Sequence, residues 1–196
     1  MGRFIDVLIS LLVLMLLAPL FLVIGILIKL NSKGPVFFVQ IRIGRNNELF
    51  SFYKFRTMKI GTPNVATDKL SDSNKYVTTI GKFLRKSSLD ELPQFINTLK
   101  GDMTFVGPRP ALYNQYELKE MRTAAGVHLL LPGLTGWAQI NGRDNNDDYT
   151  KTEYDLYYLN NKSFSLNIKI LFKTVFKVLK AEGIVDNEVK KSSKER

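Results

Sequence analysis

The sequence predicts an α/β fold of a membrane-associated kind, with an N-terminal helical anchor, a small β-hairpin and several helices. Residues 7–28 carry no charged side chain, residues 35–57 alternate like two strands around a turn, and residues 164–180 repeat apolar side chains at helical spacing. The chain accordingly divides into three parts: a membrane anchor (residues 1–30), a folded domain (residues 31–180) and a charged tail for which we expect disorder (residues 181–196).

The apolar anchor is long enough to cross a membrane, because about 20 residues of straight helix span the hydrocarbon layer. Pro19 lies near its middle, where it removes one backbone hydrogen bond and clashes with the preceding turn, so a kink or a break is expected. Arg3 flanks one end, and Lys29 and Lys33 flank the other. Positive charge at both ends suits a re-entrant hairpin with both ends in the cytoplasm. On these residues alone, a spanning helix and a re-entrant one both remain open.

A β-hairpin is expected directly after the anchor. Residues 35–43 and 48–57 alternate between apolar and polar side chains, and Gly44-Arg-Asn-Asn47 supplies the turn between them. Helical sequence resumes over residues 79–86. Near the other end of the domain, residues 131–143 contain three glycines and a proline. That composition predicts a shaped loop rather than a regular element.

The charge of the chain predicts an anionic partner. The formal net charge is +10 and the isoelectric point is near 9.7, so nucleic acid, acidic lipid and nucleotide diphosphates all qualify. The apolar anchor argues against nucleic acid, and the chain has no zinc-finger spacing or RNA-binding aromatic motif. Cysteine is absent and His128 is the only histidine. Any chemistry therefore falls to carboxylates, arginines and lysines.

Two adjacent carboxylates are the first candidates for that chemistry. Asp90 and Glu91 lie in Arg85-Lys-Ser-Ser-Leu-Asp-Glu-Leu-Pro-Gln94, between basic residues and at the start of a predicted helix. Nearby cations and a helix N-terminus both favour the ionised carboxylate, which can then act as a nucleophile.

The same segment also has a structural interpretation. Ser88 and Glu91 have the spacing of a capping box, in which both side chains satisfy free amides at a helix start. Pro93 is best tolerated in the first turn, so the helix begins nearer residue 92 than residue 89. It should run to about Lys100, because Gly101 is a natural stop.

The last predicted helix, over residues 164–180, is strongly amphipathic. Its apolar side chains share one face, and Lys169, Lys173, Lys177 and Lys180 form a stripe beside that face. The pattern suits a helix lying on an anionic membrane surface with its lysines at the headgroups. A core helix with a solvated lysine edge fits equally well.

Six short motifs occur in order along residues 2–180. They are Lys54-Phe-Arg-Thr-Met58, Ser88-Leu-Asp-Glu-Leu-Pro-Gln94, Gly101-Asp-Met103, Gly107-Pro-Arg-Pro110, Pro132-Gly-Leu-Thr-Gly136 and Asn141-Gly-Arg143. With the anchor, they resemble the bacterial sugar transferase family, and more specifically a small monotopic phosphoglycosyl transferase reduced to its catalytic core.

The resemblance implies transfer of a sugar-1-phosphate from a UDP-sugar to undecaprenyl phosphate, with release of UMP, as the first membrane step of bacterial glycan assembly. Asp90 corresponds to the family's nucleophile, which holds the phosphosugar covalently, and Glu91 would assist through Mg²⁺ or proton handling. Both carboxylates are therefore candidate Mg²⁺ ligands. The resemblance also implies an anchor that breaks at Pro19 and enters and leaves by the cytoplasmic face of the inner membrane. Ala18 departs from the serine that commonly precedes this proline in the family.

An aspartate that attacks a diphosphate approaches like charge, so Mg²⁺ and guanidinium groups are needed to neutralise the phosphates. Arg85, Arg109 and Arg143 are the strongest candidates, because a guanidinium can bind two phosphate oxygens at once. Lys54 and Arg56 are weaker ones.

Two other functions fit the sequence. One is a glycosyltransferase that moves only the sugar to a lipid acceptor and releases UDP. The other is a non-enzymatic scaffold whose basic face binds anionic membrane lipids, in which case the two carboxylates would only cap a helix. Nothing in the motifs selects one donor sugar.

Overall fold

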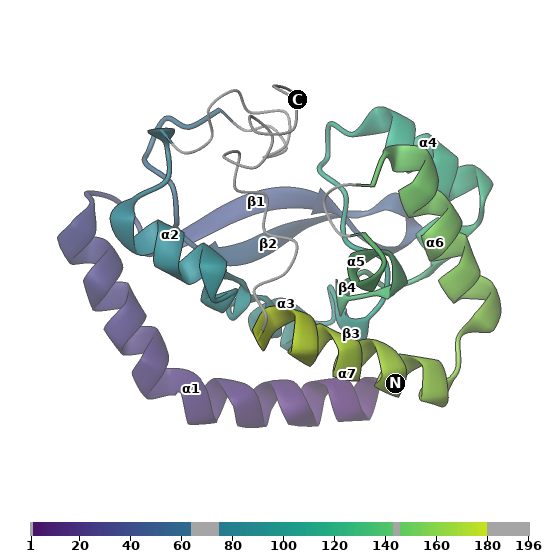
Figure 1. Cartoon of the computed structure of the whole chain (residues 1–196), viewed down its shortest axis with the longest axis horizontal. Coiled ribbons are helices and arrows are strands. Elements are labelled where there is room, and N and C mark those ends of the chain that lie inside the picture. The colour runs from purple at the N-terminus through teal and green to yellow at the C-terminus, as the bar shows by residue number, and fades with distance from the viewer. Residues whose placement is uncertain (1, 64–74, 143–145, 180–196) are drawn as a thin grey trace, which may run out of the picture.

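In the computed structural model, helices pack around two small β-sheets (Figure 1). The described residues are 2–63, 75–142 and 146–179. The helices are α1 (Arg3–Asn31), α2 (Thr79–Lys86), α3 (Gln94–Lys100), α4 (Tyr116–Ala124), α5 (Trp137–Ile140), α6 (Asp148–Asn161) and α7 (Phe164–Leu179). Short 3-10 turns are η1 (Arg45–Asn47), η4 (Leu89–Glu91) and η5 (Val127–Leu129), and the strands are β1 (Phe37–Ile43), β2 (Leu49–Phe55), β3 (Thr104–Val106) and β4 (Gly133–Thr135). The predicted mixed α/β class is confirmed.

The apolar anchor forms one continuous helix, α1, which contains Pro19. Figure 1 shows that α1 bends about midway along its length. The feature expected at the proline is thus a bend in an unbroken helix, since one missing hydrogen bond leaves the bonds on either side in place. Buried residues occur only toward the two ends, at Asp6, Ser10, Ile24 and Ile28. Along the middle of α1, the apolar side chains are exposed or half-buried.

The C-terminal half of α1 is attached to the domain by an apolar cluster. Ile24 and Ile28 pack with Phe55 of β2 and Leu84 of α2, and all four side chains are almost completely buried. Burial of side chains of this size contributes about 1.5 to 3 kcal/mol each. The cluster therefore holds the anchor, the hairpin and α2 as one packed unit.

The predicted hairpin is confirmed. Strands β1 and β2 pair antiparallel, from Phe37 opposite Phe55 to Ile43 opposite Leu49. In the turn, Asn46 and Asn47 adopt positive φ angles of 56° and 63°. Asparagine tolerates this left-handed conformation better than most residues, which explains why the turn forms here.

A second sheet was not predicted. Strands β3 and β4 pair in parallel, with Thr104 opposite Gly133 and Val106 opposite Thr135. The prediction of an irregular loop over residues 131–143 is therefore wrong for the stretch that forms β4 and α5. The glycines allow close backbone contact, since a Cβ atom at Gly133 would lie 2.1 Å from the Gly107 nitrogen. Three-residue strands are too short for an alternating pattern to reveal them.

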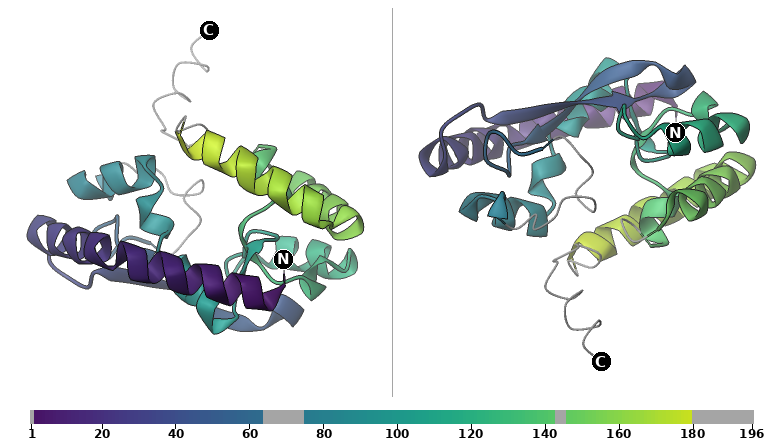
Figure 2. Two further views of the ribbon diagram at one scale, coloured as in Figure 1. Left: turned by 90° about the horizontal axis from the view of Figure 1, so that it is seen from below. Right: turned by 90° about the horizontal axis from the view of Figure 1, so that it is seen from above.

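Helix α7 begins at the predicted residue and carries both buried and exposed apolar side chains. Ile170 is fully buried in the core, whereas Ile168, Phe172 and Val175 are exposed. Figure 1 places α7 and the N-terminal half of α1 along the same lower edge of the molecule, and the left view of Figure 2 shows both on the near side when seen from below. The two helices, each with exposed apolar side chains, thus lie on one side of the protein.

Candidate active site

The two carboxylates lie in η4, a single turn between α2 and α3. Ser88 precedes this turn in the left-handed conformation, and its side chain makes no capping hydrogen bond. The capping-box interpretation is therefore wrong, because the helix proper starts only at Gln94, beyond the reach of that hydroxyl. The predicted end of the helix is confirmed, with Lys100 as the last residue and Gly101 at a φ of 101°.

Asn97 fixes α3, and with it η4, against the hairpin. Its side-chain amide donates to the Ser51 carbonyl at 2.6 Å, and its side-chain oxygen accepts from the Tyr53 amide at 3.0 Å. The fully buried side chain thus pairs with the edge of β2 in the way that another strand would. This attachment brings Lys54, the next residue of β2, to the carboxylates.

Four of the predicted site residues meet at η4. The Lys54 Nζ atom lies 2.8 Å from Glu91 Oε1 and 4.0 Å from Asp90 Oδ2. The Arg109 Nη2 atom lies 3.1 Å from the same Glu91 oxygen. Asp90 itself is 8% exposed. The structure thus brings these four predicted side chains together.

The two adjacent carboxylates have opposite electrostatic environments. Burial raises the pKa of Asp90; Lys54 opposes that rise, and the negative charge of Glu91 adds to it. Arg85 and Arg109 also oppose the rise in the pKa of Asp90. Burial alone would raise the pKa of Glu91, but Lys54 and Arg109 outweigh it and hold that pKa well below its usual range. Neighbouring acids whose pKa values are pushed apart are suited to different roles. Here Glu91 is a fixed anion, and Asp90 is the more basic carboxylate.

Arg56 does not join this cluster. Its side chain is buried and donates hydrogen bonds to the carbonyls of Ser32 and Lys33, just beyond the C-terminal end of α1. Among the described residues it therefore fastens the anchor to the hairpin. Arg143, the remaining predicted arginine, lies outside the described residues.

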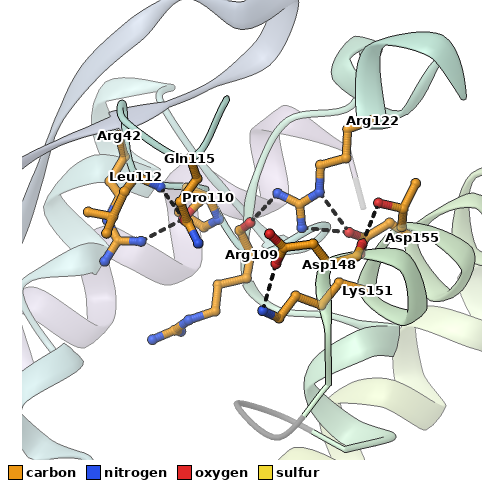
Figure 3. Close-up of polar contacts among 10 residues, drawn as sticks. Arg42, Arg109, Pro110, Leu112, Gln115, Arg122, Asp148, Lys151 and Asp155 are labelled. Atoms are coloured by element: carbon orange, nitrogen blue, oxygen red, sulfur yellow. Dashed lines mark hydrogen bonds and ion pairs between the residues drawn. The ribbon is translucent and has the colours of Figure 1, made fainter. Parts of the chain in front are cut away.

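Three polar residues that the sequence analysis missed hold the segment that carries Arg109 (Figure 3). Arg42 donates to the Pro110 carbonyl, and Arg122 donates to the Arg109 carbonyl, each at 2.9 Å. Asp155 in turn binds the Arg122 guanidinium. No local pattern could have shown these contacts, because each joins residues that are far apart in the chain or lie in different elements.

The donor set at η4 fits Mg²⁺. This ion commonly takes one or two carboxylates from the protein and completes its shell with water and substrate phosphate oxygens. Asp90 and Glu91 supply adjacent carboxylate oxygens, and no cluster of three or more acidic, histidine or cysteine ligands occurs in the described part of the chain.

Fold and site define a class of protein: an α/β protein with one helix long and apolar enough to cross a membrane, and a carboxylate pair set among basic side chains, an arrangement suited to phosphate chemistry. The profile of the bacterial sugar transferase family matches residues 1–181, and the chain belongs to this family.

Curated relatives come from several bacteria. The UDP-N-acetylgalactosamine-undecaprenyl-phosphate N-acetylgalactosaminephosphotransferase of Aeromonas hydrophila is 40% identical over 92% of this chain and 44% of its own length. The UDP-glucose:undecaprenyl-phosphate glucose-1-phosphate transferase of Escherichia coli strain K12 is 41% identical over 88% of this chain and 39% of its own length. The exopolysaccharide production protein ExoY of Sinorhizobium fredii is 39% identical, over 92% of this chain and 86% of its own length. The chain thus spans about two fifths of the first two relatives and most of the third.

Proposed function

We propose that this protein is a phosphoglycosyl transferase that moves a sugar-1-phosphate from a UDP-sugar to undecaprenyl phosphate through a covalent intermediate on Asp90. The observation that carries the proposal is the contact between the Asp90–Glu91 pair and the cations Lys54 and Arg109. The names of the Aeromonas and Escherichia relatives support the same reaction with two different sugars.

In the first step, an Asp90 carboxylate oxygen attacks the phosphorus that bears the sugar. The bond from that phosphorus to the bridging oxygen breaks, and UMP leaves with the oxygen. In the second step, a phosphate oxygen of undecaprenyl phosphate attacks the same phosphorus and releases the Asp90 carboxylate. Each step exchanges one phosphorus–oxygen bond for another, so the reaction needs no oxidant or reductant.

The environment of Asp90 suits a nucleophile. A buried carboxylate has lost much of its hydration, and a raised pKa marks a more basic oxygen that donates its electron pair more readily once ionised. Lys54 and Arg109 neutralise Glu91 and stand where an incoming diphosphate needs positive charge. Arg85, whose charge acts on Asp90, and Arg143 are proposed as further phosphate-binding residues. Mg²⁺ held by the two carboxylates would neutralise the diphosphate.

We further propose that α1 is re-entrant and that the domain lies on the cytoplasmic face of the bacterial inner membrane. Both ends of α1 are fastened to the same folded domain: Arg3 donates to the carbonyls of Thr98 and Leu99 in α3, and Arg56 binds Ser32 at the other end. A spanning helix would place those two attachments on opposite sides of the bilayer. The bend and the exposed apolar middle of α1 are what a shallow insertion requires.

The covalent step is tested without the lipid acceptor. Enzyme mixed with Mg²⁺ and a panel of UDP-sugars, including UDP-glucose and UDP-N-acetylgalactosamine, should release UMP up to one equivalent and become labelled with sugar phosphate. Rapid trapping and mass spectrometry under mild conditions should place the label on Asp90. Asp90→Asn should abolish both signals, whereas Asp148→Asn, a control at a carboxylate of α6, should change neither.

Other outcomes of this experiment contradict the proposal in distinct ways. Label on Glu91 would exchange the roles of the two carboxylates. Release of UDP in place of UMP, with transfer of the sugar alone, would indicate a glycosyltransferase. Full turnover of Asp90→Asn with undecaprenyl phosphate would exclude the covalent mechanism, and an inactive wild type that still binds anionic vesicles would favour a scaffold.

The topology is tested with single cysteines, because the natural chain contains none. Gly2→Cys and Lys33→Cys place thiols at exposed positions on either side of α1. A membrane-impermeant reagent should label both only from the cytoplasmic side. Labelling of the Gly2→Cys protein from outside intact cells would establish a spanning helix.

A further inference from the structure

A buried ion pair joins α4 to α6. The Arg122 Nη2 and Nε atoms donate to Asp155 Oδ2 at 2.6 and 3.0 Å. Arg122 is 9% exposed and Asp155 is 1% exposed. Removing two charges from water is costly, and a buried pair of this kind often adds little to stability compared with apolar side chains of the same size. Stability alone therefore gives a weak reason for this pair.

The third contact of Arg122 gives a better reason for the presence of the buried pair. Its Nη1 atom donates to the Arg109 carbonyl at 2.9 Å (Figure 3). From another element, Arg42 donates to the next carbonyl, that of Pro110. Two guanidinium groups thus hold consecutive peptide units of the Gly107–Pro110 segment. The Arg109 side chain leaves this segment and donates to Glu91 Oε1 at 3.1 Å.

Asp155 completes this arrangement by fixing the orientation of the Arg122 guanidinium. A guanidinium has its donors in one rigid plane, so two bonds to a single carboxylate oxygen determine where the third donor points. Burial raises the pKa of Asp155, and the charge and hydrogen bonds of Arg122 oppose that rise. The guanidinium that donates to the Arg109 carbonyl is thus the one that Asp155 holds in place.

We propose that Arg122 and Asp155 are positioning residues that act through Arg109, holding its backbone so that its guanidinium stays at the carboxylate pair. The inference rests on the proposed function, because the reaction supplies its readout. A small displacement of a group that neutralises charge in a transition state lowers the rate strongly. Loss of the pair should thus slow the chemical step, with a smaller effect on donor KM.

The test is the single-turnover rate of UMP release in a double-mutant cycle with Arg109. The combined variant Arg122→Met/Asp155→Leu removes both charges together, so neither is left buried and unpaired. In the folded protein we expect UMP release to fall by about tenfold to a hundredfold. In an Arg109→Ala background, which keeps the Arg109 carbonyl but lacks its side chain, the same double change should have little further effect.

A conservative variant and a matched control complete the design. Arg122→Lys keeps the charge but cannot make all three contacts, so it should be slower by about tenfold, again only when Arg109 is present. Glu120→Gln changes an exposed carboxylate of α4, the helix that carries Arg122, and should leave UMP release unchanged. If the combined variant does not fold, the rate of UMP release by Arg122→Lys, with and without the Arg109 side chain, tests the inference.

Two results would overturn the inference. One is a wild-type rate of UMP release in folded Arg122→Lys or in the folded combined variant. The other is a loss of the same size with and without the Arg109 side chain, which would show that the pair acts elsewhere. Failure of the proposed function would look different, since the wild-type enzyme would then release no UMP.

Discussion

Replacement of Arg56 by methionine tests whether this residue fastens the anchor or binds phosphate. The Arg56 Nη2 atom donates to the Ser32 carbonyl at 2.8 Å and to Ser32 Oγ at 3.0 Å, and Nη1 donates to the Lys33 carbonyl. The side chain is only 5% exposed. Methionine keeps much of the buried volume but donates no hydrogen bond, so these acceptors would lose their partner.

The expected loss follows from these contacts. A hydrogen bond to a charged group is worth about 1.5 to 3 kcal/mol, and bonds that share one guanidinium are not additive. We expect Arg56→Met to lower the free energy of unfolding by about 3 to 5 kcal/mol. For a chain of this length, that corresponds to a fall in Tm of about 10 °C. Gly34→Ala should act in the same direction, because its Cβ atom would lie 2.0 Å from Arg56 Nη1 at a φ of +124°.

The measurement is thermal unfolding in detergent, paired with turnover per folded molecule. Arg56→Lys should lose less stability than Arg56→Met, since an ammonium can keep one of the carbonyl contacts. Lys59→Met, a change at an exposed lysine beyond the hairpin, is the control and should unfold with the wild type. A wild-type Tm for Arg56→Met combined with a loss of turnover by about 10² or more would refute this reasoning and restore the phosphate-binding role.

Three further predictions concern the site. Ser88→Ala should change stability by less than about 0.5 kcal/mol in chemical denaturation, because the side chain makes no cap; a loss near 1 kcal/mol would indicate the capping box. The pKa of Glu91 is lowered in the folded protein, so the wild type should lose stability in EDTA as the pH falls below 4.5, and Glu91→Gln should flatten that loss; parallel thermal profiles would contradict the assignment. Gly133→Ala should lower both Tm and UMP release, because its Cβ atom would meet the Gly107 backbone, whereas Gly2→Ala, with open space around it, should match the wild type in both assays.

Local sequence patterns determined several elements of this protein. The alternation of apolar and polar residues on either side of Gly44 predicted the hairpin, and Gly101 predicted the end of α3. Both features depend on the residue types within a few positions of the turn or helix end. The same holds for the anchor and for the amphipathic α7. The local charge pattern made Asp90 and Glu91 candidates, although the same residues also fitted a capping box, and the role of nucleophile came from the family resemblance.

Only the tertiary structure decided which basic residues reach that pair. Lys54 and Arg56 are two positions apart, a spacing that predicts side chains on the same face of a strand. However, β2 ends at Phe55, and the Arg56 side chain binds Ser32 at the end of α1. The contacts of Arg122 with Asp155 and of Asn97 with β2 join residues 33 and 46 positions apart. Such contacts depend on how whole elements pack against each other. The residues around each partner therefore show no local sequence pattern that would predict the contact.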